Sequence, residues 1–246
     1  MGFEYPAWLQ RNWLFRRFFL FRKVFLTERR TSCYSQYGED INVPLFFPKG
    51  YVGTFVDVGC FHPVKYSNTY RLYRNGWRGV NVDIDDIKIE AFDMVRGGDA
   101  NVACAIGMTE GTVDYWRKGF YRLGSTIHAE HARGKPGYEK TTTRCRKLTS
   151  VIDDTPFAGR KIDFLSVNTE GHDDEVLRSL DFERYAPFLV AFEAYCASLD
   201  DVLSLAVYRN LSARGYVMVG WCGLTVLMMN PSHRRWPAPP QGQATY

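Results

Sequence analysis

Paired cysteine spacings, on which disulfide frameworks and zinc sites depend, are missing from this 246-residue sequence. There is no Cys-x-x-Cys pair, and the six cysteines are scattered. Most of them lie in or beside apolar, strand-like segments, as buried free thiols do. The cysteine pattern therefore predicts free thiols, a reducing cytoplasmic location and no metal site. The six are Cys33, Cys60, Cys104, Cys145, Cys196 and Cys222.

A continuous apolar run of bilayer length is also missing. The most hydrophobic stretch, 13–26, is interrupted every few residues by Arg or Lys, unlike a secretory signal or a membrane span. On a helix of about 100° per residue, one apolar face also includes Arg22, and Arg16, Arg17 and Lys23 lie opposite. This face is formed by Leu14, Phe15, Phe18, Phe19, Phe21, Phe25 and Leu26. Two interpretations of this basic amphipathic arm, 1–30, stay open. In the first, residues 11–30 lie on an anionic membrane surface, at the inner face of the membrane. In the second, the helix packs on the body of the chain.

The body of the chain lacks an excess of either charge. Residues 1–30 hold seven basic and two acidic residues, whereas the remainder holds 24 basic and 25 acidic. The net charge of +4 therefore belongs to the arm, and no nucleic-acid partner is expected. The length suits one α/β domain, which we place at 31–230, before a proline-rich loose tail at 231–246.

Short apolar runs alternate with helical patterns along the body. Their length and β-branched content are typical of parallel strands covered on both faces, at 54–59, 79–83, 101–106, 162–168 and 188–193. A smaller strand is possible at 112–116. Helices are expected at 67–75, 87–96, 172–180 and 199–214. Two last runs, 216–219 and 224–229, are close enough to form an antiparallel hairpin. The sequence thus predicts an α/β fold with a mostly parallel sheet that ends in an antiparallel hairpin.

The first two predicted strands each have an acid at or near their carboxyl end. The first closes on Asp57-Val58-Gly59 and the second on Asp83. In a doubly wound sheet a nucleotide pocket lies at this carboxyl edge, where glycine lets the backbone approach a ligand and a carboxylate accepts the hydroxyl groups of a ribose. The two strand ends therefore predict a site for an adenosine-like ligand.

Six short motifs along the chain are similar, in order and spacing, to those of the FkbM-type S-adenosylmethionine-dependent methyltransferases. The resemblance covers about 35–193 and implies a Rossmann-like class I methyltransferase fold, with a seven-stranded sheet. It also implies methylation of a hydroxyl on a sugar, glycan or other natural-product acceptor. The motifs are Ser35-Gln-Tyr-Gly-Glu-Asp-Ile41, Phe55-Val-Asp-Val-Gly59, Tyr66-Ser-Asn-Thr-Tyr70, Asn75-Gly-Trp-Arg-Gly79, Asp163-Phe-Leu-Ser-Val-Asn-Thr-Glu-Gly171 and Glu175-Val-Leu177.

The resemblance assigns residues to S-adenosylmethionine. Asp57 and Gly59 would line its methionine end, and Asp83 would hold its ribose. Gln36 would close over the cofactor, or is a surface amide. Ala105, with Ile106, would border the adenine, or is apolar filler. The segment Ser67-Asn68-Thr69 opens a helix and would meet the cofactor's carboxylate, or is an ordinary helix cap.

The chemistry is expected after the fourth strand, because transfer to an alcohol needs a placed nucleophile and a base for its proton. Glu170 is the first candidate for this base or for orienting the acceptor. His172 is the second, since its ordinary pKa suits proton transfer near neutrality, although it is also placed to cap the next helix. Family members commonly carry Asp where this chain has Asn168, which positions a hydroxyl but accepts no proton.

The connection from 119 to 146 is long, polar and basic. Its Gly124-Ser-Thr126 resembles the family, so we expect a flap over the acceptor. His128 and His131 are three residues apart, but two histidines without a third ligand favour solvated side chains over a metal site.

Two other functions remain open. Asp83-Ile84-Asp85 resembles the Asp-x-Asp motif of metal-dependent glycosyltransferases, where paired carboxylates hold an ion against a nucleotide-sugar diphosphate. The other alternative is a catalytically inactive, membrane-associated scaffold, which Asn168 makes conceivable.

Overall fold

The computed structural model describes residues 6–26, 31–119, 121 and 125–236. The chain divides into two compact units, 1–32 and 33–246. The first unit contains α1 (Ala7–Arg11) and α2 (Trp13–Phe25), and the side chain of Asn12 caps α2 by accepting the N–H of Phe15 at 3.0 Å. Over the described ranges, no helix combines the length and the apolar character needed to cross a bilayer.

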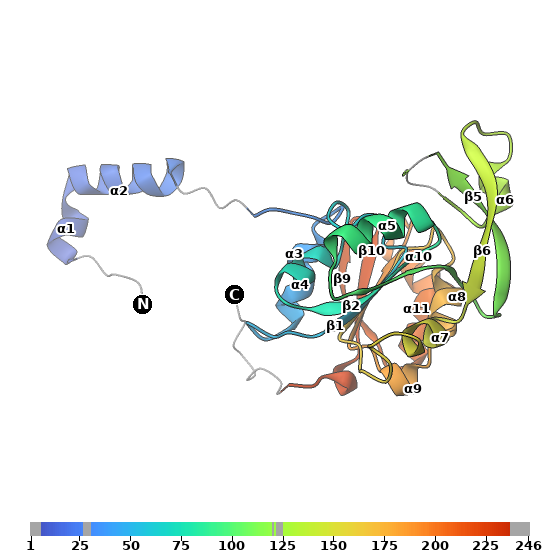
Figure 1. Ribbon diagram of the computed structural model, residues 1–246. Helices are drawn as coiled ribbons and strands as arrows, with labels where there is room; N and C mark the ends of the chain where they lie inside the picture. The colour runs from blue at the N-terminus through green and yellow to red at the C-terminus, as the bar shows by residue number, and fades with distance from the viewer. Residues whose placement is uncertain (1–5, 27–30, 120, 122–124, 237–246) are drawn as a thin grey trace. The chain divides into compact units, whose positions relative to one another are not determined.

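A seven-stranded sheet forms the centre of the second unit, in the order β3-β2-β1-β7-β8-β10-β9 (Figure 1). The first five of these strands are parallel, and β10 is antiparallel to both β8 and β9. This confirms the predicted α/β fold and its terminal hairpin. The strands are β1 (Thr54–Val58), β2 (Arg78–Asp83), β3 (Ala100–Ala103), β7 (Phe164–Val167), β8 (Leu189–Glu193), β9 (Val217–Cys222) and β10 (Thr225–Met229).

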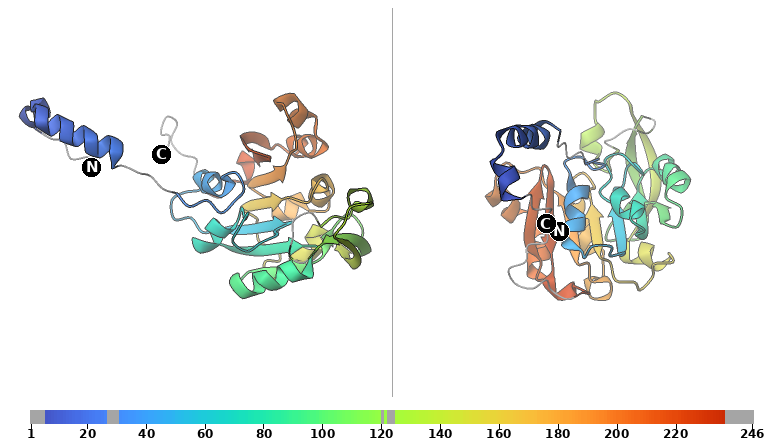
Figure 2. Two further views of the ribbon diagram at one scale, coloured as in Figure 1. Left: turned by 90° about the horizontal axis from the view of Figure 1, so that it is seen from above. Right: turned by 90° about the vertical axis from the view of Figure 1, so that its left-hand side faces the viewer.

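The centre of the sheet is buried on both faces because alternate residues of β1, β7, β8 and β10 enter two different cores. Phe55 and Phe164 belong to one core, whereas the next residues, Val56 and Leu165, belong to the other. Such two-sided burial explains why the strands are nearly continuous apolar runs. Figure 2 shows helices on both sides of the sheet.

The helices connect the strands largely as predicted, with shorter bounds. The single helix expected at 199–214 is wrong, because Leu205 takes an extended conformation and divides it into α10 and α11. The helical segments are α3 (Glu39–Asn42), η1 (Val43–Phe46), α4 (Tyr70–Arg74), α5 (Asp86–Val95), α6 (Ala129–Ala132), α7 (Leu148–Asp153), α8 (Asp173–Arg178), α9 (Phe182–Tyr185), α10 (Leu199–Ser204), α11 (Ala206–Ala213) and η2 (Pro231–His233).

A second, three-stranded sheet corrects two expectations. The run 101–106 is not one strand, because β3 ends at Ala103 and β4 (Ala105–Ile106) pairs with β6 (Tyr138–Arg146). The connection 119–146 is likewise not all loop, since β6 pairs along its length with β5 (Gly111–Lys118). The smaller strand expected at 112–116 is confirmed as β5, whereas β6 carries many exposed polar residues and no apolar run revealed it.

The beginning of the predicted tail packs on the body. The ring of Trp236 lies 4.7 Å from that of Phe188 and 5.2 Å from that of Phe47. Residues 231–236 are therefore part of the second unit, and 237–246 lie outside the described residues.

Candidate functional site

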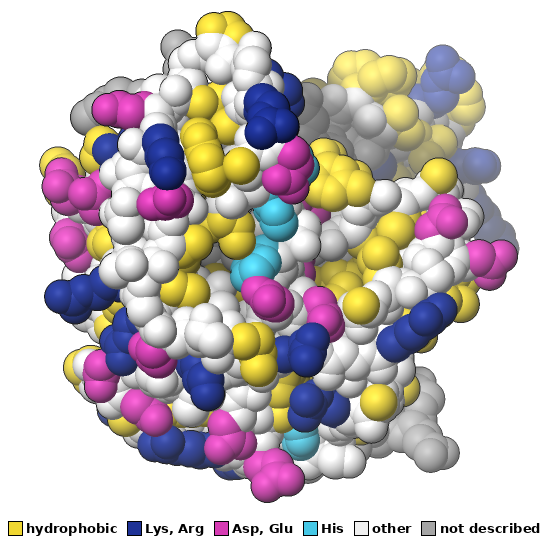
Figure 3. All heavy atoms as spheres, turned by 90° about the vertical axis from the view of Figure 1, so that its right-hand side faces the viewer, with side chains coloured by type: hydrophobic (Ala, Val, Ile, Leu, Met, Phe, Trp, Pro, Cys, Tyr) yellow, Lys and Arg dark blue, Asp and Glu magenta, His cyan; other side chains and the backbone are white. Residues whose placement is uncertain are grey.

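A pocket of about 300 Å³ lies at the carboxyl ends of β1, β2, β7 and β8. Figure 3 shows histidine and acidic side chains beside a hollow with hydrophobic walls. The position is the one at which open parallel sheets bind ligands. The lining residues are Gln36, Val58, Gly59, Phe61, Tyr66, Val82, Asp83, Ile84, Lys88, Cys104, Ala105, Ile106, Ser125, Thr126, Ile127, Asn168, Thr169, Glu170, His172, Glu193 and Tyr195.

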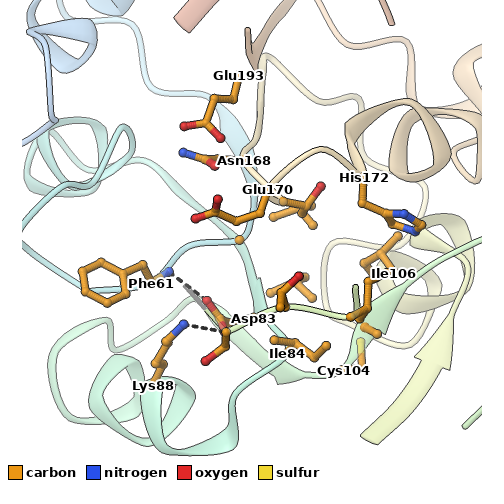
Figure 4. A pocket seen from close by; sticks show the side chains of 18 of the residues that line it. Phe61, Asp83, Ile84, Lys88, Cys104, Ile106, Asn168, Glu170, His172 and Glu193 are labelled. Atoms are coloured by element: carbon orange, nitrogen blue, oxygen red, sulfur yellow. Dashed lines mark hydrogen bonds and ion pairs between the residues drawn. The ribbon is translucent and has the colours of Figure 1, made fainter. Parts of the chain in front are cut away.

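Asp83 forms the acidic part of this pocket at the end of β2. Its carboxylate accepts the N–H groups of Phe61 at 3.0 Å and Asp85 at 2.9 Å, and lies 3.4 Å from the ammonium of Lys88 (Figure 4). The two backbone donors fix the carboxylate in one orientation. The oxygen that accepts the Phe61 N–H has a further lone pair, so Asp83 retains the capacity to accept a ligand hydroxyl group.

An apolar wall adjoins Asp83. It consists of Ile84, Cys104, Ala105 and Ile106, which are brought there by the ends of β2 and β3 and by β4. Burial raises the pKa of the Cys104 thiol to about 12, so the thiol is neutral at physiological pH. An uncharged, apolar wall beside a carboxylate suits an apolar ring joined to a group that carries hydroxyls.

Three polar side chains follow one another along the other end of the pocket. Figure 4 shows Glu193, Asn168 and Glu170 in succession, on β8 and on the loop after β7. Asp173 joins these two elements, because its carboxylate accepts the N–H of Thr169 and the N–H of Glu193, each at 2.9 Å. The loop and the strand end are thus held together beside the pocket.

Glu193 was missed in the sequence, where it appeared only as the last residue of an apolar strand. Burial raises the pKa of Glu193 to about 7; the carboxylates of Glu170 and Asp173 add to this rise, whereas Tyr195 and Asn168 oppose it. Its Oε2 is buried with no hydrogen-bond partner among the described residues. A half-buried carboxyl group with this pKa exchanges a proton readily near neutrality. An acid that ends an apolar strand was the signal available for finding it.

Backbone strain is concentrated at the pocket. Phe61, Tyr66 and Glu170 line it with φ angles of 50°, 56° and 54°, in the left-handed region that side chains with a Cβ rarely adopt. Such conformations cost about 1–3 kcal/mol each and persist where the surroundings impose them, most often at functional sites.

The structure gives a reason for glycine at position 59 that the sequence did not reveal. Its φ is 77°, and a Cβ at this position would lie 1.8 Å from the backbone oxygen of Asn168. The glycine therefore lets the chain leave β1 in contact with the end of β7, and it lines the pocket as well.

Four of the predicted cofactor residues do not line the pocket but form a hydrogen-bonded cluster beside it. Thr69 donates to Asp57 at 2.7 Å, and the buried Arg96 donates to Ser67 at 2.9 Å and to Thr69 at 3.2 Å. Asn68 donates to Ser166 on β7 at 3.2 Å. Burial raises the pKa of Asp57, and hydrogen bonding from Thr69 opposes the rise. In the structure these side chains connect β1, β7 and α4, whereas Gln36, Gly59, Asp83 and Ala105 reach the pocket.

The first two residues of α3, Glu39 and Asp40, attach the preceding segment with Gln36 to the rest of the fold. Asp40 accepts the Ser35 hydroxyl at 2.7 Å and the Nε–H of Arg71 at 3.0 Å. Glu39 accepts the hydroxyl of Thr225, on β10, at 2.8 Å. The Ser35–Asp40 motif is thereby attached to two other parts of the fold.

His172 lines the pocket at the N-terminal end of α8 but makes no side-chain cap. Its Nε2 lies 2.5 Å from a carboxylate oxygen of Glu175. The rings of His128 and His172 are 6.1 Å apart, and those of His128 and His131 are 5.3 Å apart. Part of the predicted flap, 125–127, lines the pocket, whereas Gly124 lies outside the described residues.

Within the Asp83-Ile84-Asp85 motif, Asp83 lines the pocket and Asp85 contacts other parts of the protein. Asp85 accepts the N–H of Ile87 at 3.2 Å, as the cap of α5, and lies 3.2 Å from the guanidinium of Arg117. The described part of the chain contains no cluster of three or more His, Cys, Asp or Glu residues placed to hold a metal ion. This arrangement gives the glycosyltransferase interpretation no support.

The Methyltransferase FkbM domain family matches residues 57–218. A solved structure described as the delta-N METTL16 MTase domain is similar at 10% identity and a TM-score of 0.39, over 86% of this chain and 91% of that one. No curated protein matches the chain. Since the match to the FkbM family spans most of the chain, this protein belongs to the FkbM methyltransferase family.

Proposed function

We propose that this protein transfers the methyl group of S-adenosylmethionine to a hydroxyl group of a sugar, glycan or other natural-product acceptor. The family supports a methyltransferase that uses this donor. The observation that most favours an alcohol acceptor is Glu193, a carboxyl group with a pKa of about 7 beside Asn168 and Glu170 in the same pocket as Asp83. A hydroxyl group must lose its proton as the new bond forms, and Glu193 is suited to receive it.

The pocket residues fit the donor. Asp83 would accept the ribose hydroxyls, and Ala105 and Ile106 would border the adenine. Gln36 and Gly59 lie along the same pocket, which extends to the polar end. When bound, S-adenosylmethionine supplies an activated methyl group on a sulfonium. Asp57, Ser67, Asn68 and Thr69 would act on it indirectly, by supporting the loop after β1.

The polar end of the pocket would supply the base and the groups that orient the acceptor hydroxyl. Glu193 would take the proton of the acceptor hydroxyl. The more exposed Glu170 and the amide of Asn168 would orient that hydroxyl by hydrogen bonding. His172 would act at the rim of the pocket, through its contact with Glu175. In this proposal the carboxylate missing at Asn168 is replaced by one on the neighbouring strand.

Calorimetry with S-adenosylmethionine, S-adenosylhomocysteine and UDP-sugars plus Mn²⁺ tests the donor. We expect binding of the adenosyl compounds only. Metal-dependent UDP-sugar binding would favour the glycosyltransferase, and no binding at all would favour the inactive scaffold. A donor labelled on its methyl group, incubated with candidate glycans and natural products, then tests the acceptor. Label found on nitrogen or carbon in place of oxygen would contradict the hydroxyl assignment. The cytoplasmic location stays a prediction.

A further inference from the structure

The helix α2 carries large apolar side chains without burying any residue. Leu14, Phe18, Phe21 and Phe25 are spaced by four, three and four residues, which places them within about 60° of one another around the helix. Their exposed fractions are 68%, 65%, 55% and 68%. We call these four residues the apolar stripe of α2. A stripe of this size on a helix is typical of a surface that docks on a partner.

Basic residues are arranged symmetrically about the apolar stripe. At about 100° per residue, Arg17 and Arg22 lie about 70° to either side of its centre. Arg16 and Lys23 lie on the opposite face, and residues 6–26 contain no Asp or Glu. Arginines at the edges of an apolar stripe extend their charged ends to the level of lipid headgroups while their stems stay in apolar surroundings.

We propose that α2 lies in the surface of an anionic lipid bilayer, with the apolar stripe toward the acyl chains and Arg17 and Arg22 among the headgroups. The helix is too short to cross, because 13 residues extend about 20 Å whereas the hydrocarbon core is about 30 Å thick. This inference concerns the arm alone and does not depend on the reaction performed by the body.

Charge distinguishes a bilayer from a second copy of this helix as the partner. If two copies packed stripe against stripe, the arginines at the edges of each helix would face those of the other. Without an acidic residue in 6–26 to pair with them, these contacts would be repulsive. An anionic headgroup layer supplies the opposite charge along the whole helix.

Flotation of the full-length protein with vesicles tests the proposal. Vesicles of phosphatidylglycerol and phosphatidylcholine in equal parts should bind it, vesicles of phosphatidylcholine alone much less, and added salt should weaken the binding. In the doubly substituted variant Arg17→Gln, Arg22→Gln, the partition coefficient should fall about 25-fold, because each basic residue near an anionic surface contributes about a fivefold factor.

Two double substitutions test whether binding depends on the apolar stripe itself or only on the number of aromatic rings in the helix. The variant Phe18→Gln, Phe21→Gln should bind more weakly by about a hundredfold or more, since about tenfold or more is expected for each of the two lost rings. The matched control Phe15→Gln, Phe19→Gln removes two rings of the broader apolar face that lie about 90° and 130° from the centre of the stripe, and it should stay within about threefold of the unchanged protein. Melting temperature and S-adenosylhomocysteine affinity should be the same in all variants.

Equal loss in both ring variants would overturn the proposal, as would equal binding to both kinds of vesicle or no binding to either. An oligomer that dissociates on substitution of the apolar stripe would assign that stripe to a second copy. A fall in melting temperature on its substitution would assign it to the body of the chain. If the stripe variant does not stay soluble, the arginine variant and the salt dependence of the unchanged protein decide the question.

Discussion

Glu193 is the residue on which the proposed chemistry depends most. It ends β8, points toward Asn168, and lies at the polar end of a pocket whose other end carries Asp83 (Figure 4). Asn168 cannot accept a proton, so proton transfer at this edge requires another group. In our proposal Glu193 is that group, because burial raises its pKa to about 7 and so makes its carboxylate a stronger base than an ordinary one.

Activity should therefore rise with pH through a midpoint near 7, by about tenfold per pH unit below it. The Glu193→Gln variant should lower kcat by about 10²- to 10⁴-fold and abolish this midpoint, while affinity for S-adenosylhomocysteine changes little. Methyl-transfer rates from pH 5 to 9 measure both effects. Glu170→Gln is the matched control and should retain the midpoint. If the Glu170 variant loses it instead, the base is Glu170.

The same pKa sets the sign of a stability effect. The folded protein binds the Glu193 proton more tightly than the unfolded chain does, since the pKa rises from 4.5 to about 7 on folding. The stabilisation from this group is therefore complete below about pH 4.5 and is lost as the pH rises through about 7.

Asp83 offers a second test at a single side chain. Asp83→Asn should weaken binding of S-adenosylhomocysteine by about 1–3 kcal/mol, because the charged acceptor facing the ribose hydroxyls becomes neutral. Asp86→Asn is the matched control: it removes an exposed acid three residues away that contacts Arg117 and does not line the pocket. Calorimetry on both variants measures the difference. Equal affinities would remove Asp83 from the ribose site.

At the scale of elements, the ends of β1 and β7 depend on each other. Gly59 leaves β1 with a φ of 77° and touches the backbone of Asn168, while the Asn168 N–H donates to the oxygen of Val58 at 2.9 Å. Asp173 then connects the loop after β7 to β8. The pocket is thus built at three strand ends that cannot shift independently.

Gly59→Ala should lower the free energy of unfolding by more than about 2 kcal/mol. An alanine is strained at a left-handed φ, and its Cβ would also overlap the backbone oxygen of Asn168. At Gly159, φ is 69° and a Cβ would meet no atom within 4 Å. Gly159→Ala therefore incurs only the strain, about 1–2 kcal/mol. Urea unfolding of the two variants measures the difference. Equal destabilisation would show that the contact with Asn168 contributes nothing.

At the scale of the whole molecule, the chain consists of two units with separate roles in our proposals. The second unit contains both hydrophobic cores, the pocket and every residue assigned to the reaction. The first is two helices without a buried residue.

Deletion of residues 1–30 should therefore leave the melting temperature and the affinity for S-adenosylhomocysteine unchanged, while binding to anionic vesicles disappears. Calorimetry, thermal unfolding and flotation of the shortened protein check the three outcomes. An insoluble or unfolded product would instead mean that the arm packs on the body, which is the second interpretation of its sequence.

The sequence by itself determined the strands of the main sheet, because two-sided burial demands apolar runs such as 54–59 and 162–168. It also determined the terminal hairpin and, through its motifs, the family. It did not reveal β6, whose exposed Thr and charged residues leave no apolar run.

Only the tertiary structure decided which polar residues meet. Asp57 and Asp83 have the same pattern in the sequence, yet Asp57 is bonded to Thr69 outside the pocket while Asp83 lines it. Besides burial, the pKa of Glu193 depends on Asn168, Glu170 and Asp173, which lie about 20 or more residues away in the chain. The pKa of a carboxyl group depends on burial and on charges brought close by folding, and neither is written in the residues next to it.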